Sequence, residues 1–520
     1  MDNDIYHVIG TKKKGRCAVA KRLIPCGTTI LIDLPLACVA HSQDSNSQSE
    51  LLNKHPYSSI EVSFLNEARR RGYNDFKAVL LAARVLRQLH TMTQPIPKKT
   101  HPTPVKPPPT PLNSHNPSSK HISMRELYES LNSSLSPVAT SAYMGNLQAS
   151  AMMVQRLVYP LSLSLEECKL ALQRLSNNAF SVSNASLEVI AYGLFLEASV
   201  FNHSCQPNAI HTFVQDTMVI TAARDIQAGE EVLVSYIDLA LPRCVRQAEL
   251  LAYGFVCDCV RCWSAEYVYV YVNCSKCNAS NCMQPVESYA VNTYKQWLDM
   301  RPSAKPTISE SACKRFRALG LPYVHAPVDL QCSKCMHILK HTALLKAYRA
   351  LVQAYDAAQS LLSDCYSQPA KCDRQAIGIA IVTMRTYVDL VPNSYVQCKV
   401  LEAMLELYGQ LVKHSTLLPH EGFLRSVDRY MHLYVIYLEC KFTCYDVSPS
   451  VHPAVLHSYL QYLDLGLYFS IEHQYKIPGE RLWRHRRELQ GLLVAVKRFY
   501  GSEHEYYQRT VRLEIELRHI

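Results

Sequence analysis

Three short motifs between residues 199 and 262 constrain the fold of this 520-residue chain more than any other feature. The first reads S-V-F-N-H-S-C-Q-P-N at residues 199–208, the second G-E-E-V-L-V-S-Y at 229–236, and the third Y-G-F-V-C-D-C-V-R-C at 253–262. An Asn-His turn, a β-branched run that ends in tyrosine, and three closely spaced cysteines thus follow one another. We expect the three motifs to fold together around one pocket, with a metal beside it.

Length and composition indicate what kind of protein contains these motifs. A chain of this length usually forms two to four domains, each with its own core. The hydrophobic share of 48% and the charged share of 19% are those of a globular protein, which excludes general disorder. The net charge of +10 fits a mildly basic, solvated surface, with a nucleic-acid or nucleosome contact as the alternative. With no leader-like start and no apolar run of about 20 residues, we expect an intracellular protein that does not contact membranes.

The first half of the chain alternates between strand-like and helical patterns. Short β-like runs at 17–20 and 28–36, separated by a Pro-Cys-Gly turn, predict a hairpin-like start. Residues 60–90 have the periodicity of a helix, and helix returns over 125–175. Between them, nine prolines within residues 95–117 predict a flexible linker over 92–120. The runs 180–183, 210–219 and 232–237 read as strands, with a hairpin turn at 227–230.

The second half of the chain is helical from about residue 340 onward. Amphipathic runs occur at 396–412, 424–438, 455–469, 481–499 and 503–517, and a Ser-x-x-Glu capping box at 502–505 predicts a helix start. Consecutive helices with short polar joints predict an array of helical hairpins of tetratricopeptide-like character.

The three motifs resemble the catalytic core of SET-domain protein-lysine methyltransferases of the SET and MYND (SMYD) type. The likeness is specific over residues 12–40 and 177–262 and loose from 340 to the end. It implies an α+β fold: a β-rich SET domain split between residues 1–40 and 176–262, a helical insert at 41–175, a Cys-rich segment at 263–339, and an all-α domain at 340–520. We expect the MYND zinc finger to be absent, because it needs about seven cysteines and residues 34–175 hold only Cys38 and Cys168.

The resemblance also implies an activity and its residues. It predicts methyl transfer from S-adenosyl-L-methionine to a lysine amine of a histone or another protein, in the nucleus and cytoplasm, with further protein partners on the helical domain and no direct nucleic-acid binding. Tyr236 matches the catalytic tyrosine, and Phe180 and Tyr253 match the lysine channel. The positions that match cofactor-binding residues are Lys14, Gly15, Arg16, Asn178, Ser199, Asn202, His203, Tyr236 and Phe255.

One position departs from the pattern. The family usually has a second glycine where this chain has Cys17, and a side chain there disfavours a positive φ. An alternative function is therefore a SET-fold scaffold that has lost methyl transfer and binds partners through its helical domain. A zinc-finger nucleic-acid binder would explain the cysteine pairs and the charge, but not the order of the three motifs.

Two groups of cysteines have the spacing of zinc ligands. Cys257, Cys259 and Cys262 supply three of the four thiolates that a structural zinc needs, and the resemblance implies Cys205 as the fourth. A possible second site combines two Cys-x2-Cys pairs that are separated by 54 residues, with Cys282 or Cys313 as substitute ligands. The four cysteines of these pairs are Cys274, Cys277, Cys332 and Cys335.

Overall fold

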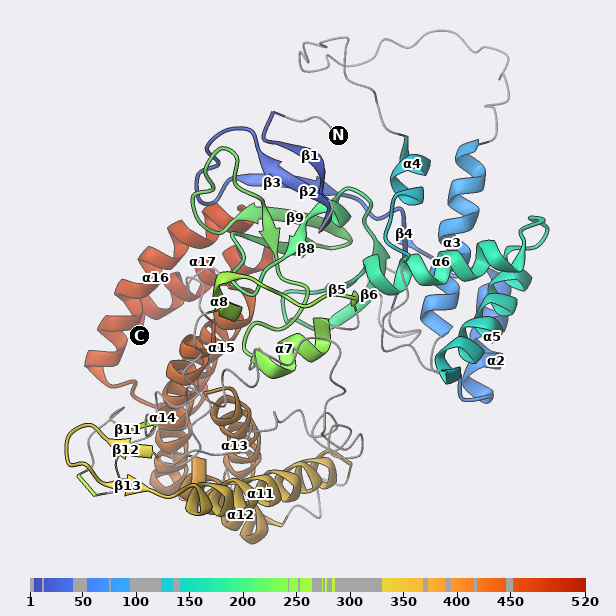
Figure 1. Ribbon diagram of the computed structural model, residues 1–520. Helices are drawn as coiled ribbons and strands as arrows, with labels where there is room; N and C mark the ends of the chain where they lie inside the picture. Colours follow the sequence, from blue (N-terminus) through green and yellow to red (C-terminus); the bar gives the residue numbers. More distant parts are fainter. Residues whose placement is uncertain are drawn as a thin grey trace. The chain divides into compact units, whose positions relative to one another are not determined.

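The computed structural model describes residues 4–11, 14–40, 54–73, 76–93, 123–133, 141–241, 243–250, 253–263, 274, 276–277, 283–285, 330–367, 373–388, 394–415, 419–445 and 452–520. The chain divides into two compact units. The first comprises Met1–Tyr236, Glu249–Cys257 and Arg498–Glu505, and the second comprises Ile237–Ala248, Asp258–Lys497 and Tyr506–Ile520. Figure 1 labels the elements of both.

Small β-sheets form the centre of the first unit. Strand β1 (Tyr6–Thr11) pairs antiparallel with β2 (Gly15–Ala20). A second sheet has the order β3 (Thr29–Asp33), β9 (Thr217–Ala222), β8 (Ala209–Val214), and a third has the order β4 (Ala37–Ala40), β6 (Val189–Leu194), β5 (Ala179–Ser183). A short parallel pair joins β7 (Asn202–His203) to β10 (Leu233–Val234). Apart from the β1–β2 pair, each of these sheets combines segments that are distant in the sequence.

The predicted strands were correct in position more often than in pairing. The runs at 17–20 and 28–36 contain β2 and β3, but β2 pairs with β1 and β3 with β9, so the predicted hairpin between them is wrong. The run 210–219 is a hairpin of β8 and β9, which turns at Gln215 with a φ of 57°. The turn at 227–230 does not close a hairpin either, because the residues that flank it bridge to the N-terminal segment, Ile226 to Ile24 and Glu231 to Val19.

A helical insert lies between β4 and β5 in the sequence. It contains α2 (Ser59–Arg70), α3 (Phe76–Thr93), α4 (Met124–Glu129), α5 (Ser141–Val158) and α6 (Leu165–Asn178). The single helix predicted over 60–90 is interrupted, because Gly72 adopts a φ of 69° directly after the end of α2. Capping boxes fix three helix starts, at Ser58, Ser123 and Ser164.

Two hydrophobic cores hold the first unit together. One lies between the helices of the insert and the strands β4 and β6, and it includes Leu80, Val85 and Leu194. The other lies among the sheets, and Phe195, Phe201 and Met218 are buried in it. Tyr236 and Phe180 are partly buried and pack against this second core. The close-packed core therefore supports the side chains of the candidate site.

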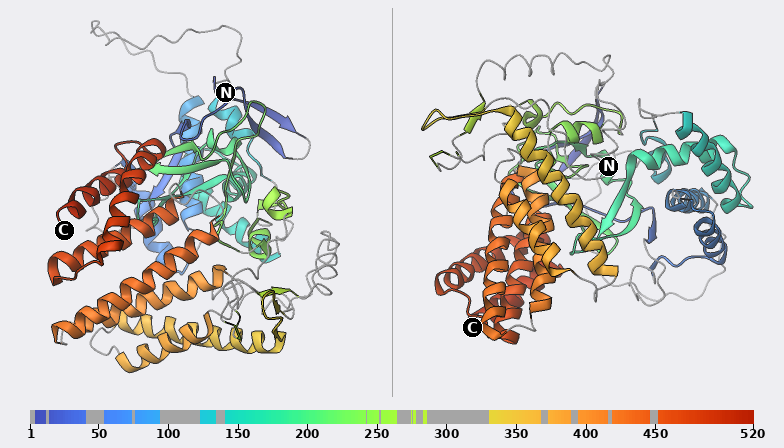
Figure 2. Two further views of the ribbon diagram at one scale, coloured as in Figure 1. Left: turned by 90° about the vertical axis from the view of Figure 1, so that its left-hand side faces the viewer. Right: turned by 90° about the horizontal axis from the view of Figure 1, so that it is seen from below.

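The second unit is largely helical. Its long helices are α11 (His341–Ser367), α12 (Arg374–Val388), α13 (Ser394–Ser415), α14 (His420–Cys444), α15 (Pro453–His473), α16 (Gly479–Tyr500) and α17 (Glu505–Arg518), although the last residues of α16 and the first of α17 belong to the first unit. Consecutive helices from α11 to α15 contact one another and lie side by side in Figure 2. Short elements precede them: α7 (Arg243–Leu250), α8 (Val260–Trp263), β11 (Met283–Pro285), β12 (Leu330–Cys332) and β13 (Ile338–Leu339).

The helical array agrees with the sequence-based prediction apart from two details. The sequence did not single out α12, and α17 begins at Glu505 rather than after Ser502, so the predicted capping box does not start that helix. No helix in the part of the chain that the structure describes is both long and apolar enough to cross a bilayer.

Candidate active site and zinc centres

Tyr236 lies at the centre of the candidate active site, two residues beyond β10. The parallel pairing of β10 with β7 sets the Asn-His motif beside the segment that leads to this tyrosine. The Tyr236 hydroxyl donates a hydrogen bond of 2.7 Å to the carbonyl oxygen of Phe201, and its backbone N–H donates one of 3.0 Å to Nδ1 of His203. Both the phenol and the backbone of Tyr236 are therefore held by the motif.

The surroundings of Tyr236 are aromatic. Burial raises the pKa of its hydroxyl well above the ordinary value, and the neighbouring Tyr253 adds to that rise. The phenol is therefore neutral near pH 7 and serves as a hydrogen-bonding group rather than as a base. The ring centroids of Tyr253 and His203 each lie 5.4 Å from that of Tyr236, and Phe255 lies 6.0 Å from His203. Such rings exclude water and attract cationic amines through their faces.

The turn between β1 and β2 contributes the N-terminal part of the site. Gly15 adopts a φ of 71°, which glycine tolerates. The Nη2 of Arg16 donates a 3.2 Å hydrogen bond to the hydroxyl of Ser199, whereas Nη1 is buried without a hydrogen-bond partner among the described residues. Burial also lowers the pKa of Arg16. A buried cationic donor without an acceptor is costly, so this atom fits the carboxylate of a bound ligand.

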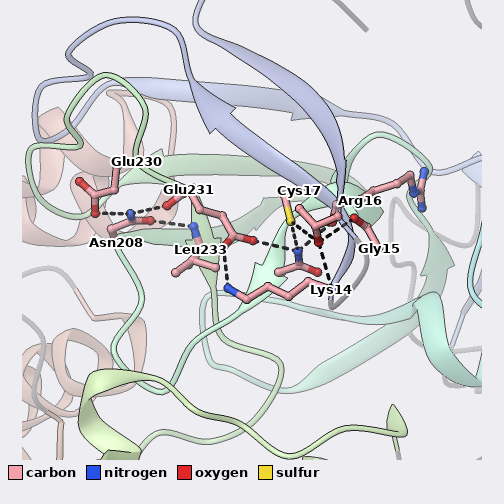
Figure 3. Close-up of polar contacts among 10 residues, drawn as sticks. Lys14, Gly15, Arg16, Cys17, Asn208, Glu230, Glu231 and Leu233 are labelled. Carbon is pink, nitrogen blue, oxygen red and sulfur yellow. Dashed lines mark hydrogen bonds and ion pairs between the residues drawn. The ribbon is translucent and has the colours of Figure 1, made fainter.

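One carboxylate joins this turn to the Asn-His motif, as Figure 3 shows for Lys14, Arg16, Cys17 and Glu231. The Nδ2 of Asn202 donates to the carbonyl oxygen of Arg16 at 2.7 Å and to Oε1 of Glu231 at 2.9 Å. The other carboxylate oxygen of Glu231 accepts a bond of 2.7 Å from Lys14 Nζ. Burial alone would raise the pKa of Glu231, but these bonds outweigh it and the pKa is lowered. Glu231 is therefore ionised and holds both segments.

A second amide, to which we assigned no role from the sequence, organises the other side of the same segment. Asn208 is 1% exposed, and its Nδ2 donates to Oε1 of Glu230 at 3.0 Å and to the carbonyl oxygen of Glu231 at 2.8 Å. Its Oδ1 accepts a 2.7 Å bond from the N–H of Leu233 (Figure 3). The signal that could have identified it is its place at the end of the first motif, where an amide can bond to backbone in both directions.

Cys17 does not adopt the positive φ that a glycine at this position would tolerate. It lies in β2, and it is not among the described residues with a positive φ. Its side chain is 3% exposed, with the sulfur 3.7 Å from the hydroxyl of Thr11 and 3.3 Å from Nδ2 of Asn202. Burial raises the pKa of this thiol. The position holds an extended, neutral cysteine packed into the network.

Two predicted site residues have well-defined contacts of another kind. Asn178 is the last residue of α6, and its Nδ2 donates to the carbonyl oxygens of Arg174 at 2.7 Å and of Asn132 at 2.9 Å. Phe180 makes edge contacts with Phe195 and His211, both at 5.9 Å between ring centroids. The roles of Asn178 toward the cofactor and of Phe180 in the lysine channel stay predictions.

The first group of cysteines is assembled as a metal site. The sulfurs of Cys205, Cys257, Cys259 and Cys262 all lie within 4.8 Å of one another, and those of Cys205 and Cys257 are 4.0 Å apart. Four thiolates around a tetrahedral zinc at about 2.3 Å would be separated by about 3.8 Å, so the arrangement fits zinc. Neighbouring donors support the ligands: Gln247 Nε2 lies 3.3 Å from the sulfur of Cys262.

The second group of cysteines is also assembled. The sulfurs of its four members lie within 4.8 Å of one another, and these members are Cys274, Cys277, Cys332 and Cys335. The substitute ligands Cys282 and Cys313 lie outside the described residues. Both groups consist of four thiols, which is the donor set of a closed, structural zinc site.

Comparison with known proteins agrees with this geometry. The family model of the SET domain matches residues 15–237. "Histone-lysine N-methyltransferase SMYD3" of Mus musculus is 37% identical over 86 residues, which is 16% of this chain and 20% of that protein. "N-lysine methyltransferase SMYD2-A" of Xenopus laevis is 40% identical over 86 residues, with the same two shares. The chain matches about a fifth of the length of these relatives.

A plant protein and a solved structure are also similar to this chain. "Histone-lysine N-methyltransferase ASHR1" of Arabidopsis thaliana is 36% identical over 102 residues, which is 19% of this chain and 21% of that protein. A solved structure, "Crystal structure of the SET domain of LSMT bound to Lysine and AdoHcy", covers 80% of this chain and 88% of its own at 15% identity, with a TM-score of 0.27 that is too low to bear on the fold.

The split sheets, the half-buried tyrosine beside an Asn-His motif and the adjoining group of four cysteines agree with the match of residues 15–237 to the SET-domain family model. More particularly, the chain is similar in sequence to SMYD3 and SMYD2-A over 16% of its length, and it has an α+β fold with a helical C-terminal region.

Proposed function

We propose that this chain is an S-adenosyl-L-methionine-dependent protein-lysine N-methyltransferase. One observation carries the proposal: the Tyr236 hydroxyl is fixed on the carbonyl oxygen of Phe201 at 2.7 Å, while its backbone is bonded to His203 of the Asn-His motif. A half-buried tyrosine at this place would pack equally well without either bond. The double attachment aims the phenol oxygen at one point, which positional catalysis requires.

The site suits the chemistry of a lysine amine. A free lysine has a pKa of about 10.4 and must lose its proton before nitrogen can attack a methyl group. The rings of Tyr253 and Phe255 exclude water, and desolvation disfavours the ammonium form. The hydroxyl of Tyr236 retains lone pairs that can accept a bond from the amine and so orient it. S-adenosyl-L-methionine supplies an electrophilic methyl group on a positively charged sulfur.

The residues of the turn and the motif would hold the cofactor. Arg16 offers an unpartnered buried Nη1 to a carboxylate, and Ser199 lies beside it. Asn202 and His203 would bind the same amino-acid end, whereas Phe255 would stack on the adenine ring. Lys14 and Gly15 would bring the backbone of the turn close to the cofactor, and Asn178 would complete the set from the end of α6.

The substrate in this proposal is a lysine in a histone or in another protein of the nucleus or cytoplasm. The names of SMYD3 and ASHR1 as histone-lysine methyltransferases support the first, and that of SMYD2-A as an N-lysine methyltransferase leaves room for the second. The helices α11 to α17 would offer a surface to protein partners. We expect neither membrane nor direct nucleic-acid binding to be part of this activity.

Cofactor binding separates the enzyme from a SET-fold scaffold. Calorimetric titration of the full chain with S-adenosyl-L-methionine should give saturable binding, and Arg16→Ala should weaken it because a charged hydrogen bond of about 1.5–3 kcal/mol is lost. If no heat of binding develops at millimolar cofactor, the chain is a scaffold and the enzyme proposal fails.

Methyl transfer itself is tested with labelled cofactor on peptide arrays and protein extracts. Tyr236→Phe should lower the rate by about a hundredfold or more, because the oriented hydroxyl is removed while the ring remains. Tyr57→Phe is a matched control, since that hydroxyl also donates a 2.7 Å bond to a backbone carbonyl, that of Ala40, outside the site. Equal rates for the two variants would overturn the assignment of Tyr236.

A further inference from the structure

We propose that Cys274, Cys277, Cys332 and Cys335 bind one zinc ion as a structural zinc ribbon, and that this metal holds their two Cys-x2-Cys turns together. This site is separate from the methyl-transfer residues and from the thiolates of Cys205, Cys257, Cys259 and Cys262. The inference does not depend on the proposed enzymatic activity. It rests on sulfur positions, on backbone hydrogen bonds and on how few of the described side chains around them are buried.

The sulfur positions are those of a tetrahedral site. The sulfur of Cys274 lies 3.5 Å from that of Cys335, and the sulfur of Cys277 lies 3.7 Å from that of Cys332. Zinc at about 2.3 Å from four thiolates would set them about 3.8 Å apart. Both distances are far above the roughly 2.05 Å of a disulfide, so neither pair is bonded covalently. Each close pair combines one cysteine from either side of the 54-residue separation.

The two Cys-x2-Cys segments have the same local structure. In the first, the N–H of Lys276 lies 3.4 Å from the sulfur of Cys274. In the second, the N–H of Lys334 lies 3.4 Å from the sulfur of Cys332, in the same relative position, and the N–H of Cys335 adds another contact at 3.4 Å. Backbone N–H groups directed at sulfur stabilise a thiolate, which is the form that binds metal. The segments therefore form a matched pair of metal-binding turns.

A small sheet places these turns opposite each other. Strand β12 lies between β11 and β13, and its last residue, Cys332, is paired with Met283 of β11. The turn after β12 closes tightly, because the N–H of Met336 donates to the carbonyl oxygen of Cys332 at 3.0 Å and Met336 adopts a φ of 58°. The N–H of Cys332 in turn donates to the carbonyl oxygen of His337 at 2.9 Å. These backbone hydrogen bonds fix the turn that carries Cys332 and Cys335.

The described part of this segment buries few side chains. Among its side chains whose burial the structure describes, only those of Cys274 and Cys332 are buried, while Met336 and Ile338 are 61% and 41% exposed. Its strands have three, three and two residues. A sheet this short does not fold on its own in water without an apolar core or a cross-link. Four thiolates around zinc supply the cross-link, and with no open position the metal is structural.

Metal content of the full-length protein tests the inference. Purified wild-type chain should contain two zinc ions, and the double variant Cys274→Ser, Cys332→Ser should contain one. Cys259→Ser should also contain one, because it removes the other site. When cobalt replaces zinc in Cys259→Ser, the visible absorption of tetrahedral cobalt thiolate should remain. Cys282→Ser and Cys313→Ser are matched controls, and both should keep two zinc ions.

A second readout keeps the test decisive if a variant folds poorly. Lys276 and Lys334 are exposed in the two turns, and trypsin cleaves after them only when the local backbone opens. Loss of metal should raise the cleavage rate after both residues by about tenfold or more, in the double variant and in chelated wild type, with circular dichroism reporting unchanged helix. Two outcomes would overturn the inference: unchanged zinc content in the double variant, or loss of one zinc in Cys282→Ser or Cys313→Ser.

Discussion

The backbone N–H of Tyr236 donates a 3.0 Å hydrogen bond to Nδ1 of His203, and this bond fixes the tautomer of the imidazole. Because Nδ1 accepts, Nε2 carries the proton in the neutral ring. That Nε2 lies 3.3 Å from the sulfur of Cys205, one of the four thiolates of the first zinc centre. One side chain thus joins the candidate catalytic tyrosine to a metal ligand, as outer partners of metal sites often do.

His203 should therefore position Tyr236 as well as bind cofactor. In His203→Ala the N–H of Tyr236 would lose its partner, at a cost of about 1–3 kcal/mol for a buried group, so we expect kcat to fall by roughly tenfold to a hundredfold. His203→Asn, which can still accept at a similar place, should recover part of that loss. Steady-state kinetics with measured zinc content tests this, and wild-type kcat in His203→Ala would contradict it.

The extended conformation of Cys17 leads to a prediction about cofactor affinity. It tests whether this cysteine impairs cofactor binding, which was the reason for considering a scaffold function. If the family glycine were needed for its freedom at positive φ, Cys17→Gly would improve cofactor affinity. Cys17 instead lies in β2, with its sulfur 3.3 Å from Nδ2 of Asn202. We expect Cys17→Gly to lower the free energy of unfolding by about 0.5–1 kcal/mol for the flexibility alone, and to leave or weaken affinity.

Cys17→Ser is the control, since it keeps a Cβ and a short side chain that can still contact Asn202. Denaturant unfolding measures the stability of the wild type, Cys17→Gly and Cys17→Ser, and calorimetric titration measures their affinity for the cofactor. An increase in cofactor affinity of tenfold or more in Cys17→Gly would show that the wild-type cysteine obstructs the site.

Much of the site could be predicted from the sequence because its residues lie in short, dense motifs. The thiolates at Cys257, Cys259 and Cys262 needed only local spacing, and the structure confirms that they gather with Cys205. Strand pairing could not be predicted in the same way. Whether β2 pairs with β1 or with β3 depends on contacts between distant segments, and the runs of alternating residues are equally suited to either partner.

The supporting network was missed for a related reason. Glu231 and Asn208 belong to the motifs, but their importance lies in partners that are distant in the sequence, such as Lys14. A helix break was missed because Gly72 follows a run whose apolar positions continue with the same period on both sides. Periodicity reports which face is buried and does not report where the backbone turns.

Asp33 should make the stability of the first unit depend on pH. Burial raises the pKa of this carboxyl to about 6, against a hydrogen bond of 2.9 Å from the N–H of Ala198 that opposes the rise. The unfolded chain binds the same proton only below about pH 3.9. Between these values the folded state holds more protons, so the contribution of Asp33 to stability is present at low pH and is lost as pH rises through about 6.

Asp33→Asn removes the titration and keeps an acceptor for Ala198. The free energy of unfolding of the variant minus that of the wild type should therefore increase between pH 4 and pH 7, by up to about 3 kcal/mol. Urea unfolding at several pH values measures it. Parallel curves for the two proteins over this range would contradict the assignment.

Two adjacent carboxylates, Glu231 and Glu230, offer a comparison of site positioning with general stability. Glu231 bonds to Lys14 Nζ at 2.7 Å and to Asn202 Nδ2 at 2.9 Å, which belong to the segments proposed to bind the cofactor. Glu230 bonds to Arg224 and to Asn208 instead, on the other side of the chain. Replacing either by glutamine removes one charge at nearly constant shape. The two variants therefore differ only in which segment loses its charged hydrogen bonds.

We expect Glu231→Gln to weaken cofactor binding by about tenfold, because loss of about 1.4 kcal/mol in charge-assisted bonding leaves Lys14 and Asn202 less well placed. Glu230→Gln should lower the free energy of unfolding by a similar amount and change affinity by less than about twofold. Titration with S-adenosyl-L-methionine and urea unfolding of both variants separate the effects.

Since Glu231 is bonded to an exposed lysine, salt should weaken binding in the wild type more than in Glu231→Gln, because screening acts on the ion pair that the variant lacks.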